Sequence, residues 1–168
     1  GVINEDSDAY IKAPEEWHAI PSSLDAIARL TQAGYTIAVA TNQSGIGRGL
    51  YTEEQFFDLT DWMVDQFVEQ SVFPSAVFHC PHHPEKGVGE YKVKCDCRKP
   101  EPGMLLQAAE QLELSLADSI MVGDKESDMI AADKAGITKR FLISSHYHEN
   151  SSILANHVVK ISDVTEQI

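Results

Sequence analysis

Short apolar runs alternate with amphipathic helical segments along this chain, and that alternation limits the folds open to it more than any other feature. Residues 36–40 read TIAVA, an almost continuous apolar run typical of a strand covered on both faces. The same criteria predict further strands at residues 76–79, 119–122, 140–144 and 158–161. Apolar residues at helical spacing predict helices at residues 22–33, 52–67, 104–112 and 126–135. Elements in this order predict an α/β fold with a doubly wound parallel sheet.

Polar residues follow three of these strands, at the edge where parallel sheets bind their ligands. Thr41, Asn42, Gln43 and Ser44 come directly after TIAVA and lead into the glycine-rich segment 45–49. Backbone N–H groups in such a loop can hold an anion. A simple turn is the alternative for this segment.

A carboxylate follows the strand predicted at residues 119–122, where Gly123 is succeeded by Asp124. This residue is suited to Mg²⁺, which takes one or two carboxylates together with phosphate and water. Taken alone, Asp124 could also be a helix N-cap, with Asp128 as a solvated acid of the first turn. The polar segments at three strand ends favour the magnesium ligand.

All three cysteines of the chain fall between residues 80 and 97, in the pattern C-x-H-x12-C-x-C. Cys80, His82, Cys95 and Cys97 supply two close pairs of ligands, the usual arrangement of a structural zinc site. Three unrelated buried cysteines, or a disulfide with one thiol left over, are the alternatives. The odd number of cysteines and the short Cys95–Cys97 spacing argue against a disulfide.

Two cations, Arg98 and Lys99, come directly after the last cysteine and just before a predicted helix. A metal-bound loop would hold them in place, and together they suit a phosphorylated substrate, since Arg gives bidentate hydrogen bonds and Lys a point charge. A solvated basic turn is the alternative.

Composition narrows the class of partner. With 168 residues and a formal net charge of −13, the chain suits one acidic domain rather than a nucleic-acid-binding protein, which needs clustered cations. No apolar run approaches the length of a membrane span. Because zinc-ready thiols fit a reducing compartment, we expect a cytoplasmic protein. We also expect a monomer that acts on a small molecule.

The motifs TNQSGIGRG, CPHHP with CDCRKPEPGML, and MVGDKESDM together resemble those of haloacid-dehalogenase-like (HAD-like) phosphatases. Within that superfamily the chain is similar to the D-glycero-D-manno-heptose 1,7-bisphosphate 7-phosphatases over nearly its whole length. The resemblance implies a single domain over residues 1–168 with a zinc-binding loop at 80–97 and no large cap domain. It implies a Mg²⁺-dependent hydrolase that removes the C7 phosphate through an aspartyl-phosphate, in the synthesis of lipopolysaccharide precursors.

The resemblance also implies roles for individual residues. Thr41 and Lys99 would hold the transferring phosphoryl group, and Asp124 would bind Mg²⁺. Arg98 would recognise the sugar or its remaining phosphate, and Lys125 matches a position near metal and substrate. The implied substrate-contacting stretches are Thr41, Asn42, Gln43 and Ser44, and an early segment made of Ser7, Asp8, Ala9 and Tyr10. This early segment departs from the family's Asp-His-Gly-Tyr and keeps only the tyrosine.

One family motif has no counterpart in this sequence. Family members carry Asp-x-Asp-Gly-Val-Ile-Asn at the end of the first strand, where the first aspartate is the nucleophile and a magnesium ligand and the second is the general acid and base. The sequence here begins Gly1-Val2-Ile3-Asn4, and the pair Asp6 and Asp8 follows no apolar strand. We therefore expect residues 1–168 alone to lack the first strand, the nucleophile and hydrolase activity.

Three other functions remain open at this stage. Histidinol-phosphate phosphatases carry a similar zinc loop, although the glycine-rich run and the longer spacer before Cys95 argue against that family. A catalytically inactive sugar-phosphate binder with structural zinc is the second alternative. The third is a purely structural acidic domain with a zinc site.

Overall fold

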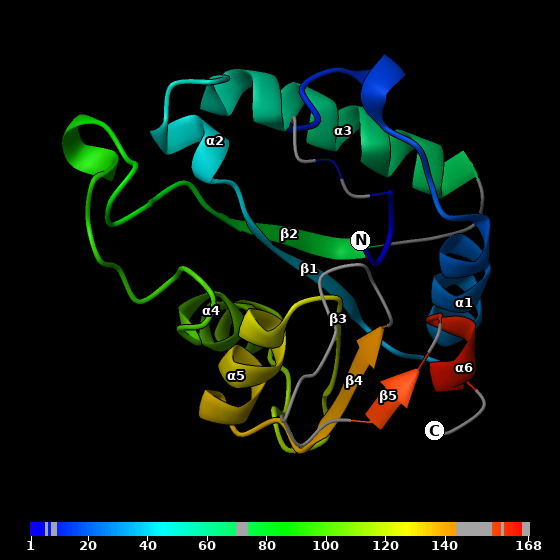
Figure 1. Ribbon diagram of the computed structural model, residues 1–168. Helices are drawn as coiled ribbons and strands as arrows, with labels where there is room; N and C mark the ends of the chain where they lie inside the picture. Colours follow the sequence, from blue (N-terminus) through cyan, green and yellow to red (C-terminus); the bar gives the residue numbers. More distant parts are fainter. Residues whose placement is uncertain (6, 8–9, 70–73, 144–155, 159, 166–168) are drawn as a thin grey trace.

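The computed structural model describes residues 1–168 apart from 6, 8–9, 70–73, 144–155, 159 and 166–168 (Figure 1). Its helices and strands follow one another along the chain in this order: η1 Pro14–Glu16, α1 Pro21–Gln32, β1 Ile37–Asn42, α2 Ser44–Gly47, α3 Glu53–Glu69, β2 Pro74–Cys80, η2 Gly89–Tyr91, α4 Gly103–Gln111, β3 Ile120–Gly123, α5 Glu126–Lys134, β4 Lys139–Ile143, β5 Asn156–Val158 and α6 Ser162–Thr165. None of the helices described is long and apolar enough to cross a membrane.

All the strand pairs described are parallel, as the alternation of elements predicts. β1 pairs with β2, so that Thr41 lies opposite His79 near the carboxyl ends. β3 pairs with β4, which in turn pairs with β5. The strands form two sheets, β1-β2 and β3-β4-β5, instead of one continuous sheet. Residues of β1 and of β3 line a common cavity of about 1080 Å³, because no strand among the described residues joins the two sheets.

Helices cover both faces of these strands, which makes the fold doubly wound. Figure 1 shows α3 on one side and α4 and α5 on the other. Alternate residues of each strand supply the two cores, as the period of a strand requires. Ile120 and Val122 of β3 pack in the core formed with α1, α3 and α6, whereas Met121 between them packs against α4 and α5. Apolar runs without polar alternation were therefore the right signal for these buried strands.

The predicted boundaries agree with the observed ones to within a few residues at most ends, with one clear error. The last strand was predicted at residues 158–161 but spans Asn156–Val158. Ile161 lies beyond this strand, directly before α6, and is only 4% exposed, so its apolar character comes from core packing rather than from a strand. The short helix α2 was not predicted, since its sequence SGIG has the composition of a loop. Ser144, the last residue of another predicted strand, lies outside the described residues.

Candidate active site and metal cluster

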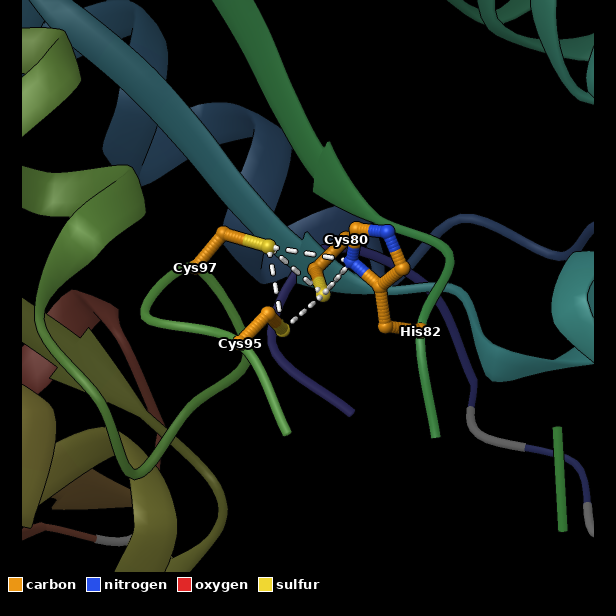
Figure 2. Close-up of side chains that lie close together, drawn as sticks. All are labelled: Cys80, His82, Cys95 and Cys97. Atoms are coloured by element: carbon orange, nitrogen blue, oxygen red, sulfur yellow. Dashed lines mark hydrogen bonds between the residues drawn. The ribbon is translucent and has the colours of Figure 1, made fainter. Parts of the chain in front are cut away.

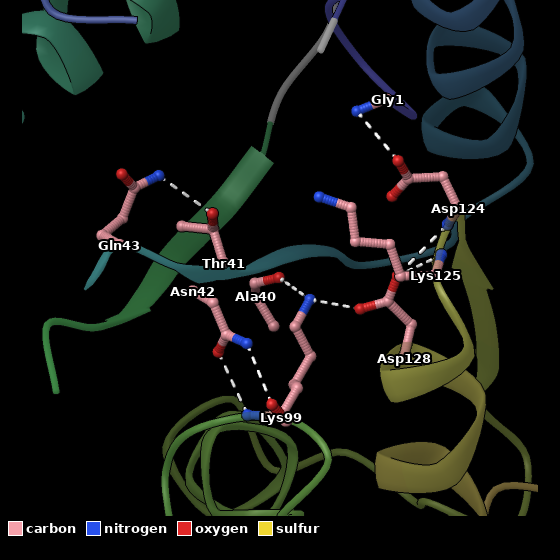
Figure 3. Close-up of polar contacts among 9 residues, drawn as sticks. All are labelled: Gly1, Ala40, Thr41, Asn42, Gln43, Lys99, Asp124, Lys125 and Asp128. Carbon is pink, nitrogen blue, oxygen red and sulfur yellow. Dashed lines mark hydrogen bonds and ion pairs between the residues drawn. The ribbon is translucent and has the colours of Figure 1, made fainter. Parts of the chain in front are cut away.

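The polar side chains at the carboxyl ends of β1 and β3 meet those that precede α4 (Figure 3). Thr41 and Asn42 close β1, and Asp124 and Lys125 connect β3 to α5. Lys99 reaches the same place from the segment between Cys97 and α4. Every predicted catalytic, substrate-binding or magnesium residue that the structure describes lines the cavity between the two sheets: Ser7, Tyr10, Thr41, Asn42, Gln43, Ser44, Arg98, Lys99, Asp124 and Lys125. Asp8 and Ala9 lie outside the described residues.

Lys99 is held by two oxygen atoms. Its Nζ lies 2.7 Å from Oδ1 of Asp128 and donates a hydrogen bond of 2.6 Å to the carbonyl oxygen of Ala40. The side chain of Lys99 is 10% exposed and that of Asp128 is 6% exposed, so the ion pair is shielded from water. Such a pair fixes the position of the Lys99 ammonium at the carboxyl end of β1.

Asp128 is a buried acid that organises the start of α5. Its Oδ2 accepts hydrogen bonds from the backbone N–H groups of Asp124 at 3.1 Å and Lys125 at 3.0 Å. The helix N-cap is Lys125, not Asp124. The alternative of a solvated Asp128 beside an N-capping Asp124 is therefore wrong, because both carboxylates are buried at the end of β3.

Asp124 is 7% exposed and lines the cavity. A buried carboxylate is costly unless a positive charge stands beside it. A carboxylate in this position fits a ligand of Mg²⁺, which prefers hard oxygen donors.

Asn42 ties the end of β1 to the backbone of Lys99. Its Nδ2 donates to the carbonyl oxygen of Lys99, and its Oδ1 accepts the N–H of the same residue, each at 3.0 Å. Both polar ends of the carboxamide are thus engaged with the main chain, across 57 positions of sequence. Asn42 lines the cavity, but its contacts in this structure are those of a residue that positions Lys99.

A second group of polar contacts surrounds Thr41. Gln43 Nε2 donates a hydrogen bond of 3.0 Å to Thr41 Oγ1, and the hydroxyl of Tyr51 donates to Gln43 Oε1. Tyr10, which adopts a φ of 64°, packs at an angle to Tyr51 and accepts a hydrogen bond from Arg48. Nothing in the sequence marks Tyr51 as a site residue, because an aromatic residue after a glycine-rich segment is indistinguishable from an ordinary core residue.

The four predicted metal ligands converge on one point (Figure 2). The Sγ atoms of Cys80 and Cys95 lie 3.5 Å apart, and Cys97 Sγ lies 3.0 Å from Cys80 and 3.3 Å from Cys95. His82 directs Nδ1 at the cluster, 3.6 Å from Cys80 and 3.4 Å from Cys97. All three cysteines are free thiols, so the disulfide alternative is wrong. Zn–S bonds of about 2.3 Å in a tetrahedron place sulfurs about 3.8 Å apart, so a small expansion of this cluster accommodates zinc.

The neighbouring histidine has a different task. His83 Nδ1 accepts hydrogen bonds from the backbone N–H groups of Glu85 at 3.2 Å and Lys86 at 3.0 Å, and His83 is not a member of the cluster.

Burial, with the hydrogen bond to Cys97, raises the pKa of Cys80, so a cation is needed to favour its thiolate form.

The metal cluster is connected to the cavity through Arg98. The guanidinium Nη1 of Arg98 donates a hydrogen bond of 3.2 Å to the carbonyl oxygen of His82, and Arg98 itself lines the cavity. The segment between Arg98 and α4 is fixed as well, since the N–H of Gly103 donates a hydrogen bond of 2.8 Å to the carbonyl oxygen of Asp96. A Cβ at position 103 would lie 2.4 Å from that same oxygen, which explains the glycine at the start of α4. Loop, cluster and cations therefore form one unit.

The fold is that of the HAD-like hydrolases, and a family model described as HAD-hydrolase-like matches residues 96–163. The chain is 45% identical over 143 residues to the D-glycero-beta-D-manno-heptose-1,7-bisphosphate 7-phosphatase of Vibrio cholerae, an alignment covering 85% of this chain and 76% of that protein. It is 43% identical to the Escherichia coli K12 protein of the same name, with 85% and 74% covered. The chain belongs to this family of heptose-bisphosphate phosphatases.

A solved structure supports the same assignment. The D,D-heptose 1,7-bisphosphate phosphatase from B. bronchiseptica, crystallised with magnesium and phosphate, superposes with a TM-score of 0.83 at 37% identity. The match covers 99% of this chain and 92% of that one.

Proposed function

We propose that this protein is a Mg²⁺-dependent phosphatase that removes the C7 phosphate of D-glycero-β-D-manno-heptose 1,7-bisphosphate, a step in the synthesis of lipopolysaccharide heptose precursors. The observation that carries the proposal is the convergence of Thr41, Lys99 and Asp124 on one cavity at the carboxyl ends of β1 and β3. The names of relatives above 40% identity supply the substrate. The related phosphatase crystallised with magnesium supports the choice of metal.

Each residue has a defined part in this proposal. Lys99, fixed by Asp128 and the carbonyl of Ala40, places its ammonium where negative charge develops on the phosphoryl oxygens. The Thr41 hydroxyl offers a hydrogen bond to the same group. Asp124 would hold Mg²⁺, which would supply positive charge to the phosphate. Arg98, on the cavity wall, binds the sugar or its remaining phosphate, and Lys125 lies near metal and substrate. The further substrate-side residues are Ser7, Tyr10, Asn42, Gln43 and Ser44.

Zinc has a structural part in the proposal. Cys80, Cys95, Cys97 and His82 would supply all four ligands of a structural zinc ion, which would leave no position for a catalytic water. The loop 80–97 then acts as a rigid arm that delivers Arg98 and Lys99 to the cavity, consistent with the Arg98–His82 contact. The free thiols of this cluster suit a reducing cytoplasm, and we place the protein there as a single-domain monomer.

Hydrolysis in this family's manner needs an attacking carboxylate. No Asp-x-Asp in residues 1–168 follows an apolar strand, so we propose that these residues by themselves do not hydrolyse the substrate. The full activity is proposed for the protein in which an Asp-x-Asp at the end of a strand stands beside Thr41, Lys99 and Asp124. Its first aspartate would form the aspartyl-phosphate and its second would act as general acid and base.

A substrate comparison tests the function. The full-length protein encoded by the gene is assayed for phosphate release from heptose 1,7-bisphosphate and from histidinol phosphate, with Mg²⁺ and with EDTA. We expect a higher kcat/KM for the heptose bisphosphate and loss of turnover with EDTA. A preference for histidinol phosphate would assign the protein to the alternative enzyme class, and binding without any turnover would make it a sugar-phosphate binder.

A further inference from the structure

Three side chains form a continuous hydrogen-bonded row that ends on the proposed phosphate-binding hydroxyl. Tyr51 donates its phenolic proton to Gln43 Oε1, and Gln43 Nε2 donates to Thr41 Oγ1 at 3.0 Å. The row starts in the core, because Tyr51 is 7% exposed and packs with Ile46 and Phe56. It ends at the cavity wall on β1 (Figure 3 shows the Gln43–Thr41 part).

In this structure the hydrogen bonds run outward from the buried end. A carboxamide has one acceptor oxygen and one donor nitrogen, so with the Tyr51 hydroxyl donating to the oxygen of Gln43, the nitrogen faces Thr41. Burial, and in second place the neighbouring Tyr10, raises the pKa of Tyr51 to about 12, so the hydroxyl keeps the proton that it donates to Gln43 throughout the neutral range.

This direction matters for Thr41. A hydroxyl group has one proton and can also accept hydrogen bonds, and in the structure Oγ1 already accepts one from Gln43. Its proton is then left for another acceptor. Phosphoryl oxygens only accept hydrogen bonds, so a Thr41 hydroxyl held in this way is ready to donate to a phosphoryl group. If Gln43 presented its oxygen instead, the Thr41 proton would point at Gln43.

The local backbone makes room for this arrangement. Gly45 lies directly below the Tyr51 ring, and a Cβ there would come within 2.1 Å of the ring atom Cε1. The ring also meets Tyr10 with centroids 6.1 Å apart. The absence of a side chain at Gly45 therefore leaves room for the Tyr51 ring next to the carboxyl end of β1. This role of the glycine is separate from the binding of an anion by the backbone of segment 45–49.

We propose that Tyr51 is a positioning residue for phosphoryl transfer, acting through Gln43 to orient the hydroxyl of Thr41. The proposal rests on the proposed phosphatase function, since the group that receives the Thr41 proton is the phosphoryl group. Tyr51 does not contact substrate itself. Its loss is expected to weaken the transition state more than the binding of the ester, because the oriented donor is most valuable where charge develops.

The first experiment removes only the phenolic oxygen. Tyr51→Phe in the full-length protein is expected to lower kcat about tenfold, which corresponds to about 1.4 kcal/mol, with KM changed less than about twofold. Tyr35→Phe is the matched control, because Tyr35 is 41% exposed and lies at the opposite end of β1. The control is expected to match the wild type. A thermal midpoint of Tyr51→Phe close to that of the wild type excludes a folding defect as the cause of a lower kcat.

A double-mutant cycle separates orientation from packing. Thr41→Val removes the hydroxyl that Tyr51 is proposed to orient, so adding Tyr51→Phe to it should cause no further loss. Independent losses that multiply would overturn the proposal, and so would wild-type kcat in Tyr51→Phe alone. The same cycle is measured by calorimetry with orthovanadate, a mimic of the transferring phosphoryl group in its transition state, where a coupled loss of affinity is expected and an additive one counts against the proposal. The binding measurement requires no turnover and no particular substrate. If the proposed substrate is wrong, the measurement still tests whether Tyr51 orients Thr41 through Gln43.

Discussion

The buried ion pair between Lys99 and Asp128 gives a sharp prediction about stability. In Asp128→Asn the carboxylate becomes a neutral amide of the same shape, and the ammonium of Lys99, 10% exposed, loses its counter-charge. Asp128 also accepts two backbone N–H groups, so the amide must direct its single oxygen either to them or to Lys99. The NH₂ group of the amide then faces the remaining donors, which are either the Lys99 ammonium or the two backbone N–H groups.

The size of the effect follows from burial. Removing one partner of a buried pair costs about 3–5 kcal/mol because the other charge is left uncompensated in a poorly solvated place. A domain of this kind is stable by about 5–15 kcal/mol, so Asp128→Asn should bring the protein close to the limit of stability. The matched control is Asp133→Asn, which breaks an ion pair with Arg140 in which Asp133 is 70% exposed. An exposed pair is worth less than about 1 kcal/mol.

Urea unfolding followed by circular dichroism measures both variants. A second substitution, Lys99→Met, is then added to Asp128→Asn. Removing the unpaired charge should restore at least half of the lost free energy of unfolding, since the penalty lies in the isolated ammonium. Equal losses in Asp128→Asn and Asp133→Asn, or no recovery in the double variant, would refute the argument that the Lys99–Asp128 pair is a buried one.

Three further predictions concern the site itself. Lys99→Ala in the full-length protein should lower kcat at least about 100-fold, whereas Arg98→Ala should mainly raise KM; equal effects on KM alone from both would contradict their separate roles. The cluster should bind about one zinc per chain, measured by metal analysis, with little change in His83→Ala and loss of metal in Cys95→Ser, and chelation should increase hydrogen exchange at residues 80–99 more than in the sheets. Residues 1–168 alone should release no phosphate, and fusion to a strand ending in Asp-x-Asp should restore Mg²⁺-dependent turnover; turnover by 1–168 itself would show that the nucleophile lies among its own carboxylates.

The elements that build the cores could be predicted from the sequence. TIAVA and the other continuous apolar runs form parallel strands that contribute residues such as Ile37, Ala40 and Val122 to the cores, and such runs lack the polar alternation of a strand with one solvent-facing side. The helix boundary at Thr52 was visible as well, since Thr52 and Gln55 exchange the two hydrogen bonds of a capping box at 2.9 and 3.1 Å. The metal cluster could be predicted because its ligands come in two close pairs.

Other features depend on contacts between distant parts of the chain. The sequence left Asp128 open between a solvated acid and a site residue, because its partner Lys99 is distant in the sequence and lies beside it only in the packed fold. The same is true of Asn42, whose two hydrogen bonds reach residue 99. Tyr51 carried no signal at all, since its role depends on the place of its hydroxyl and not on its residue type. Local patterns predict elements and ligand sets, whereas the orientation of each side chain comes from tertiary packing.

The proposed removal of the C7 phosphate is tested by finding which of the two phosphates the substrate loses. The full-length protein is incubated with D-glycero-β-D-manno-heptose 1,7-bisphosphate and Mg²⁺, and the reaction is followed by ³¹P nuclear magnetic resonance. The account predicts that the C7 signal disappears as inorganic phosphate appears, while the C1 phosphate remains, and that Lys99→Ala abolishes the change. Loss of the C1 phosphate, or unchanged turnover in Lys99→Ala, would contradict it.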